Sequence, residues 1–146
     1  MGLVKVESSE GITTITMTRA DKRNALSQAL CDDLYDAYRG FEAGDDKVAI
    51  LQADGPAFCV GADLKEPPSA MWKAVPHVSH ALTKPVICAT QGWVIGGAIC
   101  MVMTCDLMVS ADTTKFMYPE AKVGVFGGLM PGIVSRMPHK VAMELL

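Results

Sequence analysis

The sequence predicts an α/β domain in which short strands alternate with helices. Three observations support this prediction. Apolar residues near the N-terminus recur at strand spacing, those after residue 27 recur at helical spacing, and short continuous apolar runs follow at 48–51 and 86–89. The chain has 146 residues, and a domain of this size buries about 68–70% of the surface that it exposes when unfolded. We therefore treat residues 1–146 as one domain.

The first elements form a β-β-α-β unit. Residues 4–6 and 12–18 are rich in β-branched residues and predict an opening hairpin that turns at Glu10-Gly11. Ser27 is a suitable N-cap for the helix that follows. The apolar residues of that helix share one face: Leu30, Leu34, Ala37, Tyr38 and Phe41. The apolar run 48–51 then predicts a buried strand.

The loop at 54–65 contains the first candidate hydrogen-bond donor, a backbone amide. It enters what we expect to be one helical turn at Asp63, so that Gly61 and Ala62 place small residues and free amides at a helix start. After two prolines, residues 71–82 predict a further helix, which carries Trp72, His77 and His80.

The pair Gly96-Gly97 contains the second candidate hydrogen-bond donor, also a backbone amide. These glycines lie between the strand 86–89 and a helix at 98–104 that is apolar on every side. The first amides of a helix have no partner within it, and a residue without a Cβ lets a ligand oxygen approach them. The amides of Ala62 and Gly97 could thus form a pair of donors around one oxygen. The alternative is that the glycines only let two buried elements pack closely.

A carboxylate follows the last predicted strands, which span 106–111 and 114–117. Glu120 comes just beyond a strand end in an apolar neighbourhood, where burial is expected to raise its pKa and let it carry a proton near neutral pH. The alternative is a solvated surface glutamate that pairs with Lys122.

Composition narrows the class of ligand. The net charge is −3 with no run of Lys or Arg, so we expect no nucleic-acid or anionic-membrane partner. The longest apolar stretch, 93–103, is shorter than the roughly 20 residues of a membrane helix. The five cysteines form no C-x-x-C pair, which favours reduced, buried thiols and no metal site. These features favour a soluble, cytoplasmic protein that binds small ligands.

Six segments in order along nearly the whole chain resemble the enoyl-CoA hydratase/isomerase (crotonase) family. They are RADKRNAL (19–26), GPAFCVGADL (55–64), KPVICA (84–89), GWVIGG (92–97), CDL (105–107) and PE (119–120). The resemblance implies a crotonase-like (ClpP/crotonase) spiral of repeated β-β-α units, usually assembled as homo-oligomers, either trimers or pairs of trimers. Because family members continue for roughly as long again, we expect this chain to lack their C-terminal helical region and to expose the apolar surface that this region covers.

The resemblance also assigns roles. The amides of Ala62 and Gly97 would form the oxyanion hole for a thioester carbonyl. The stretch Ala62, Asp63, Leu64 and Lys65, together with Gly97, would hold the coenzyme A portion. The basic residues Arg19, Lys22 and Arg23 would lie near its phosphates or in a solvated loop. The coenzyme A thioester is the expected substrate, and no cofactor is expected.

One departure decides the finer prediction. Hydratases of the family usually carry a glutamate at each of the positions of Cys100 and Glu120, and only Glu120 is present here. A single base favours double-bond isomerisation. Hydration of a 2-enoyl-CoA with an atypical second site, or a non-catalytic acyl-CoA-binding relative, stays open as an alternative. Cys100 is either a buried core thiol or a reactive group, although a hydrolase lacks support because no G-x-S-x-G elbow is present. The stretch 124–132 fits the glycine-rich pattern of the family poorly.

Overall fold

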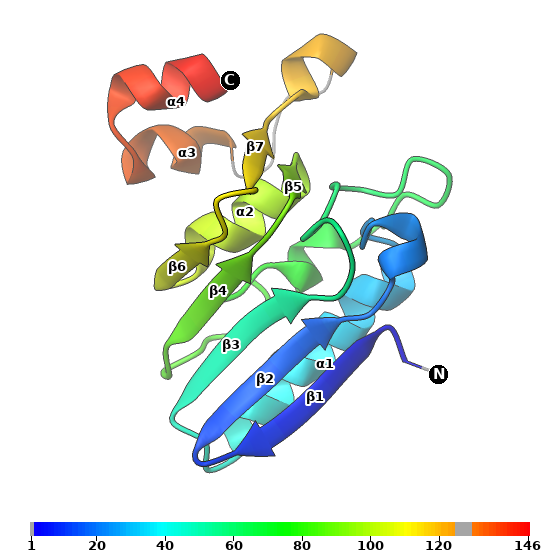
Figure 1. Ribbon diagram of the computed structural model, residues 1–146, viewed down its shortest axis with the longest axis vertical. Coiled ribbons are helices and arrows are strands. Elements are labelled where there is room, and N and C mark those ends of the chain that lie inside the picture. The colour runs from blue at the N-terminus through cyan, green and yellow to red at the C-terminus, as the bar shows by residue number, and fades with distance from the viewer. Residues whose placement is uncertain (1, 125–129) are drawn as a thin grey trace.

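The computed structural model describes residues 2–124 and 130–146. In that part of the chain the strands form two sheets (Figure 1). The larger sheet has the order β1-β2-β3-β4-β6 and contains β1 (Val4–Ser9), β2 (Ile12–Met17), β3 (Val48–Ala53), β4 (Val86–Thr90) and β6 (Leu107–Ser110). The smaller sheet pairs β5 (Trp93–Ile95) with β7 (Lys115–Met117). The predicted α/β class and the opening β-β-α-β order of elements along the chain are confirmed.

The opening hairpin forms as predicted. β1 and β2 are antiparallel, with Val4 opposite Met17 and Ser9 opposite Ile12. Glu10 and Gly11 have φ values of 52° and 80°, and such a two-residue turn with both φ positive matches the twist of a hairpin. The pairs β2–β3, β3–β4 and β4–β6 are all parallel, so the carboxyl ends of these strands meet at one edge of the sheet.

The helices complete two successive β-β-α units. In the first, β1 and β2 lead to α1 (Gln28–Ala43), and the hydroxyl of Ser27 accepts the predicted capping bond from the Leu30 amide at 3.3 Å. In the second, β4 and β5 lead to the buried helix α2 (Gly97–Thr104). Figure 1 shows α1 behind the β1–β3 half of the sheet. The remaining helices are α3 (Met130–Arg136) and α4 (His139–Leu145), with 3₁₀ turns η1 (Ala20–Lys22), η2 (Met71–Ala74) and η3 (Glu120–Val123).

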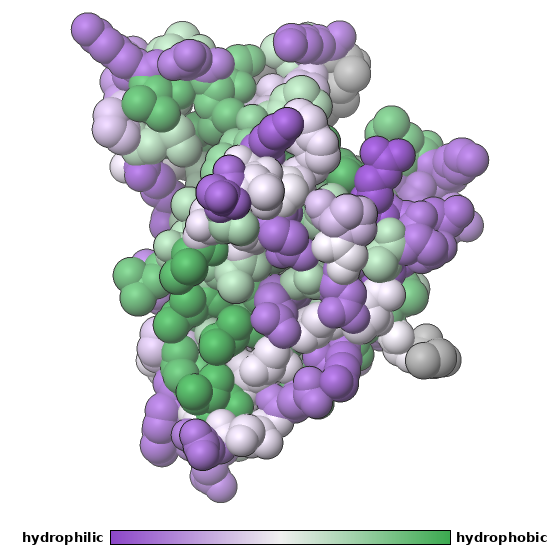
Figure 2. Space-filling model, viewed as in Figure 1, coloured by the Kyte–Doolittle hydropathy of each residue, from purple (hydrophilic) through white to green (hydrophobic). Residues whose placement is uncertain are grey.

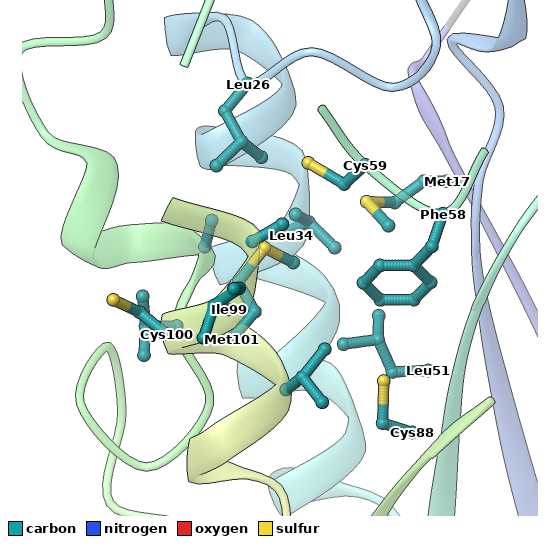
Figure 3. Close-up of a cluster of buried hydrophobic side chains, with 14 of the residues drawn as sticks. Met17, Leu26, Leu34, Leu51, Phe58, Cys59, Cys88, Ile99, Cys100 and Met101 are labelled. Atoms are coloured by element: carbon teal, nitrogen blue, oxygen red, sulfur yellow. The ribbon is translucent and has the colours of Figure 1, made fainter. Parts of the chain in front are cut away.

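The core lies between the sheet and helices α1 and α2 (Figure 3). Met17 and Leu51 come from the sheet, Leu34 from α1 and Met101 from α2, and all four are fully buried. Phe58, from the loop after β3, fills the space between them. The core therefore anchors both the loop that carries Ala62 and the helix that begins at Gly97.

Two predicted helices are wrong. Residues 71–82 form only the 3₁₀ turn η2, because Pro76 lacks an amide proton and disfavours helical φ and ψ at the residue before it. His77 next has a φ of 61°, outside the right-handed helical region. The expected turn at Asp63 does not form either. The Asp63 carboxylate instead accepts the amides of Lys65 and Glu66 at 3.0 and 3.2 Å, and such side-chain bonds compete with helix formation.

One edge of the molecule is apolar. The side chains of Leu107, Met108 and Val109 in the edge strand β6 are 62%, 48% and 65% exposed. Figure 2 shows apolar residues gathered on this side of the molecule. In the described residues, no helix is both long and apolar enough to cross a membrane.

Tyr38→Phe tests the contact that ties α1 to η2. The ring of Tyr38 is fully buried and its hydroxyl donates to the carbonyl oxygen of Ala74 at 3.1 Å. Removal of the hydroxyl leaves that carbonyl without its donor, so we expect a loss of about 1–2 kcal/mol in the free energy of unfolding. Denaturant titration measures this loss. The control Tyr35→Phe keeps the half-buried ring that meets Trp72 edge-on at 6.1 Å, and should cost about 0.5 kcal/mol or less. Equal losses would contradict the assignment.

Candidate active site

The Gly96-Gly97 junction contains the second predicted donor, the amide of Gly97. Gly96 has a φ of 58° and its amide donates to the carbonyl of Met117 at 3.0 Å, which joins the end of β5 to the end of β7. Gly97 is the first residue of α2, and no side chain caps that end of the helix. The Gly97 amide thus lies at an uncapped helix start, as predicted.

The backbone on both sides of Ala62 is fixed by Leu26. The Leu26 amide donates to the Gly61 carbonyl at 2.8 Å, and the Asp63 amide donates to the Leu26 carbonyl at 2.9 Å. The Ala62 amide between them has no acceptor among the described residues. The donor therefore lies on a strand-like bridge rather than at the helix start that the sequence predicts.

The two donors lie in adjoining backbone segments. Gly61 has a φ of 85°, and a Cβ built there would lie 2.8 Å from the carbonyl oxygen of Ile95 and 3.7 Å from the nitrogen of Gly97. Only a residue without a Cβ allows this approach. The structure thus brings the stretches that contain Ala62 and Gly97 together, although they are far apart in the sequence.

The side chain of Glu120 turns inward toward this junction. A Cβ built on Gly96 would lie 2.7 Å from the Oε1 atom of Glu120. Oε2 is buried and has no hydrogen-bond partner among the described residues. Burial raises the pKa of Glu120, against the smaller opposing effect of a bond from its own amide. The structure shows no ion pair with Lys122, which is exposed, so the alternative of a solvated, lysine-paired glutamate does not hold in the described residues.

Two further side chains, which the sequence did not single out, border the site. The thioether of Met71 lies against Gly97, because a Cβ built there would be 2.8 Å from its sulfur. Tyr118 is 6% exposed, and burial, with added repulsion from the charges of Glu120 and Cys100, raises its pKa to about 12. The position of Tyr118 directly before Pro119-Glu120 was the available signal for it. Nothing in the sequence places Met71 beside Gly97.

The residues predicted to hold coenzyme A differ in exposure, because Asp63 is largely buried whereas Leu64 and Lys65 lie on the surface. Asp63 pairs with Arg19 at 2.7 Å, and both side chains are largely buried. Leu64 is 92% exposed and Lys65 is exposed. The guanidinium of Arg19 is therefore bound to a carboxylate, whereas Lys22 and Arg23 stay on the surface, where a phosphate can reach them.

The cysteines lie in or beside the core. Cys31, Cys59, Cys88 and Cys100 are buried, and Cys105 is half-buried. Burial raises the pKa of Cys31 to about 11 and that of Cys59 to about 12, which disfavours the thiolate that a nucleophile needs. The described residues contain no cluster of three His, Cys, Asp or Glu side chains that could hold a metal ion.

The groove between β1 and α1, with a volume of about 670 Å³, does not suit the same ligand. Its lining includes Asp33, Asp36, Asp45 and Asp46, which would repel the phosphates of coenzyme A. The junction of Gly61, Gly97 and Glu120 remains the candidate site. Part of the glycine-bearing stretch 124–132, namely residues 125–129, lies outside the described residues.

The sequence model of the enoyl-CoA hydratase/isomerase family matches residues 7–146. The chain belongs to that family. A human protein named enoyl-CoA hydratase domain-containing protein 3, mitochondrial, is 33% identical over 94% of this chain and 50% of its own length. The (E)-benzylidenesuccinyl-CoA hydratase of Thauera aromatica is 29% identical over 98% of this chain and 61% of its own.

Solved structures of the enoyl-CoA hydratase/isomerase family have the same fold. The enoyl-CoA hydratase of Mycobacterium tuberculosis H37Rv matches with a TM-score of 0.87 and 31% identity, over 99% of this chain and 61% of that one. The crotonase-like fold is thus confirmed. This chain spans 50–61% of the length of the curated relatives named above. Cytoplasmic localisation stays a prediction, since the name of the human relative places that protein in mitochondria.

A pair of glycine variants tests the backbone approach at the site. Gly61→Ala introduces a Cβ at a φ of 85° and 2.8 Å from the Ile95 carbonyl oxygen, so we expect a loss of about 2 kcal/mol or more in the free energy of unfolding. The control Gly40→Ala lies in α1 with nothing within 4 Å of the new Cβ, and should stabilise by about 0.5–1 kcal/mol. A neutral Gly61→Ala in chemical denaturation would refute the close approach.

The buried carboxylate of Glu120 predicts a pH-dependent stability. Because its pKa is raised above 4.5 in the folded state, the folded protein binds more protons than the unfolded chain just above that pH. The wild type should therefore lose stability as pH rises through the window between the unfolded and folded pKa values. Glu120→Gln cannot ionise and escapes this loss, so its stability relative to wild type should increase with pH and then level off. A difference that stays constant from about pH 4 to about pH 8 would show that Glu120 is solvated.

Proposed function

We propose that this chain acts on enoyl-CoA thioesters through an enolate, with Glu120 as the single acid/base and double-bond isomerisation as the favoured reaction. The observation that carries the proposal is the packing of the Glu120 carboxylate against Gly96, one residue before the donor Gly97. The membership of the enoyl-CoA hydratase/isomerase family supports the substrate class.

The proposed reaction begins with the thioester oxygen between the amides of Ala62 and Gly97. The carboxylate of Glu120 removes a proton from C2 of a 3-enoyl-CoA, and the electrons of that bond move toward the thioester oxygen. The resulting dienolate is stabilised where its charge develops; loss of one such donor typically costs ~10²–10³ in rate. Glu120 then returns the proton to C4, which leaves the double bond between C2 and C3. No oxidant, water or cofactor is consumed.

The raised pKa of Glu120 suits this role. A carboxylate that is costly to ionise is a stronger base once ionised, and it can also keep the proton between the two transfers. The missing hydrogen-bond partner of Oε2 among the described residues leaves that oxygen available to a substrate proton.

Hydration of a 2-enoyl-CoA is the second candidate. The names of the relatives favour it, since both the human and the Thauera proteins are called hydratases or hydratase-domain proteins. A water molecule would then need a second polar group in place of the carboxylate that is missing at Cys100. The phenol of Tyr118, close enough to Glu120 for their charges to interact, is the candidate for that group. A non-catalytic acyl-CoA-binding protein is the remaining alternative.

Product analysis in D₂O separates these candidates. The protein is incubated with a 2-enoyl-CoA and, separately, with a 3-enoyl-CoA. We expect a product whose double bond has moved and which has gained no water, with deuterium incorporated only as far as protonated Glu120 exchanges with solvent between the two transfers. We expect Glu120→Gln to turn over ~10²–10⁴ times more slowly. Addition of water would favour the hydratase. Measurable binding without any reaction would favour the non-catalytic alternative.

We also expect the chain to self-associate. The exposed apolar side chains of Leu107, Met108 and Val109 in the edge strand β6 favour burial against another chain. We therefore propose that the chain forms a homo-oligomer, and the family resemblance implies a trimer or a pair of trimers. Light scattering after size exclusion should find a mass above that of the 15.6 kDa chain, and a stable monomer would contradict self-association.

A further inference from the structure

The ion pair between Arg19 and Asp63 lies directly beside the proposed oxyanion hole. The Nη1 atom of Arg19 is 2.7 Å from Oδ2 of Asp63, and the two side chains are only 13% and 12% exposed. The same nitrogen donates to the carbonyl of Ala25 at 2.8 Å. Arg19 therefore connects the start of η1 to the residue that follows Ala62.

This pair completes a clamp around Ala62. Hydrogen bonds to Leu26 fix the carbonyl of Gly61 and the amide of Asp63, one on each side of Ala62. The Oδ1 atom of Asp63 accepts two amides further along the loop, while Oδ2 accepts Arg19. The Gly61 carbonyl and the Asp63 amide and carboxylate are thus all engaged, whereas the Ala62 amide between them has no acceptor among the described residues.

Charge gives Arg19 a second effect. The nearby guanidinium holds the pKa of Asp63 below its ordinary value, so Asp63 is an anion next to the place where negative charge develops on the thioester. A partly buried carboxylate there would oppose that charge, and a partner cation cancels most of its field. Loss of Arg19 would leave the carboxylate uncompensated, whereas loss of both charges would not.

We propose that Arg19 is a positioning residue of the oxyanion hole, which holds the Ala62 amide in place and neutralises Asp63 beside it. This inference rests on the proposed function of that amide. It predicts that removal of Arg19 weakens thioester polarisation and lowers kcat largely because the carboxylate of Asp63 is left unpaired. Both losses should therefore be partly reversed when that carboxylate is also removed.

Polarisation of a bound thioester reads this role directly. The absorption band of a conjugated enoyl-CoA moves to the red when its carbonyl accepts hydrogen bonds, and this readout does not require turnover. We compare wild type with Arg19→Met and with Arg19→Met/Asp63→Asn, in which the asparagine oxygen can still accept the loop amides. Lys84→Met is the matched control, because Lys84 ties the end of α1 through the carbonyls of Phe41 and Gly44 before β4 begins, away from the site.

We expect Arg19→Met to lose most of the red shift and to lower kcat about 10- to 100-fold, with KM changed by about threefold or less. The double variant should recover at least about half of the shift, and Lys84→Met should keep all of it. An unchanged shift in Arg19→Met, no recovery in the double variant, or an equal loss in Lys84→Met overturns the positioning role. A wild-type protein that gives no red shift contradicts the proposed function itself.

Discussion

A backbone ladder through β5 holds the candidate site together. On one side of β5, the Cys59 amide donates to the Trp93 carbonyl at 3.1 Å and the Ile95 amide donates to the Cys59 carbonyl at 3.0 Å. On the other side, β5 pairs with β7 and the Gly96 amide donates to Met117. This strand of three residues thus joins the loop before Ala62 to the strand before Glu120. Without β5, the two donor amides and the Glu120 carboxylate would not lie close together.

The site contains strained backbone and a buried carboxylate oxygen, and the surrounding structure tolerates both. Gly61 and Gly96 adopt positive φ values, and Glu120 keeps a carboxylate oxygen without a partner among the described residues. Each of these features costs stability where it occurs. The burial of core side chains, among them the fully buried Met17, Leu34, Leu51 and Met101, offsets that cost. Groups of this kind cluster at functional sites, which supports the assignment on physical grounds.

Local sequence patterns predicted what depends on local chemistry. The hairpin turn, the Ser27 cap, the amphipathic face of α1 and the strands β3, β4 and β6 follow from spacing and residue type within short windows. The sequence left two alternatives open for Glu120, a buried carboxylate with a raised pKa and a solvated one beside Lys122, and the structure agrees with the first. The family and its fold followed from the order of six short segments.

The remaining features depend on contacts that the sequence does not show. The short strand β5 was hidden among glycines, since three residues are too few for an alternating pattern. The helical turn at Asp63 was wrong because the Asp63 carboxylate accepts loop amides and pairs with Arg19, 44 residues away. Arg19 looked like a surface cation for a phosphate, and only its buried partner reveals a different role. Met71 comes close to Gly97 by tertiary packing alone.

Convergence of the Ala62 and Gly97 amides on one thioester oxygen is the central claim. An amide-resolved NMR titration tests it with two ligands, an acyl-CoA thioester and a thioether analogue that lacks the carbonyl oxygen. We expect the thioester to shift the amide protons of Ala62 and Gly97 together, with one saturation curve, and the thioether to leave both nearly unchanged. Equal shifts with both ligands, or shifts confined to the groove between β1 and α1, would contradict the account.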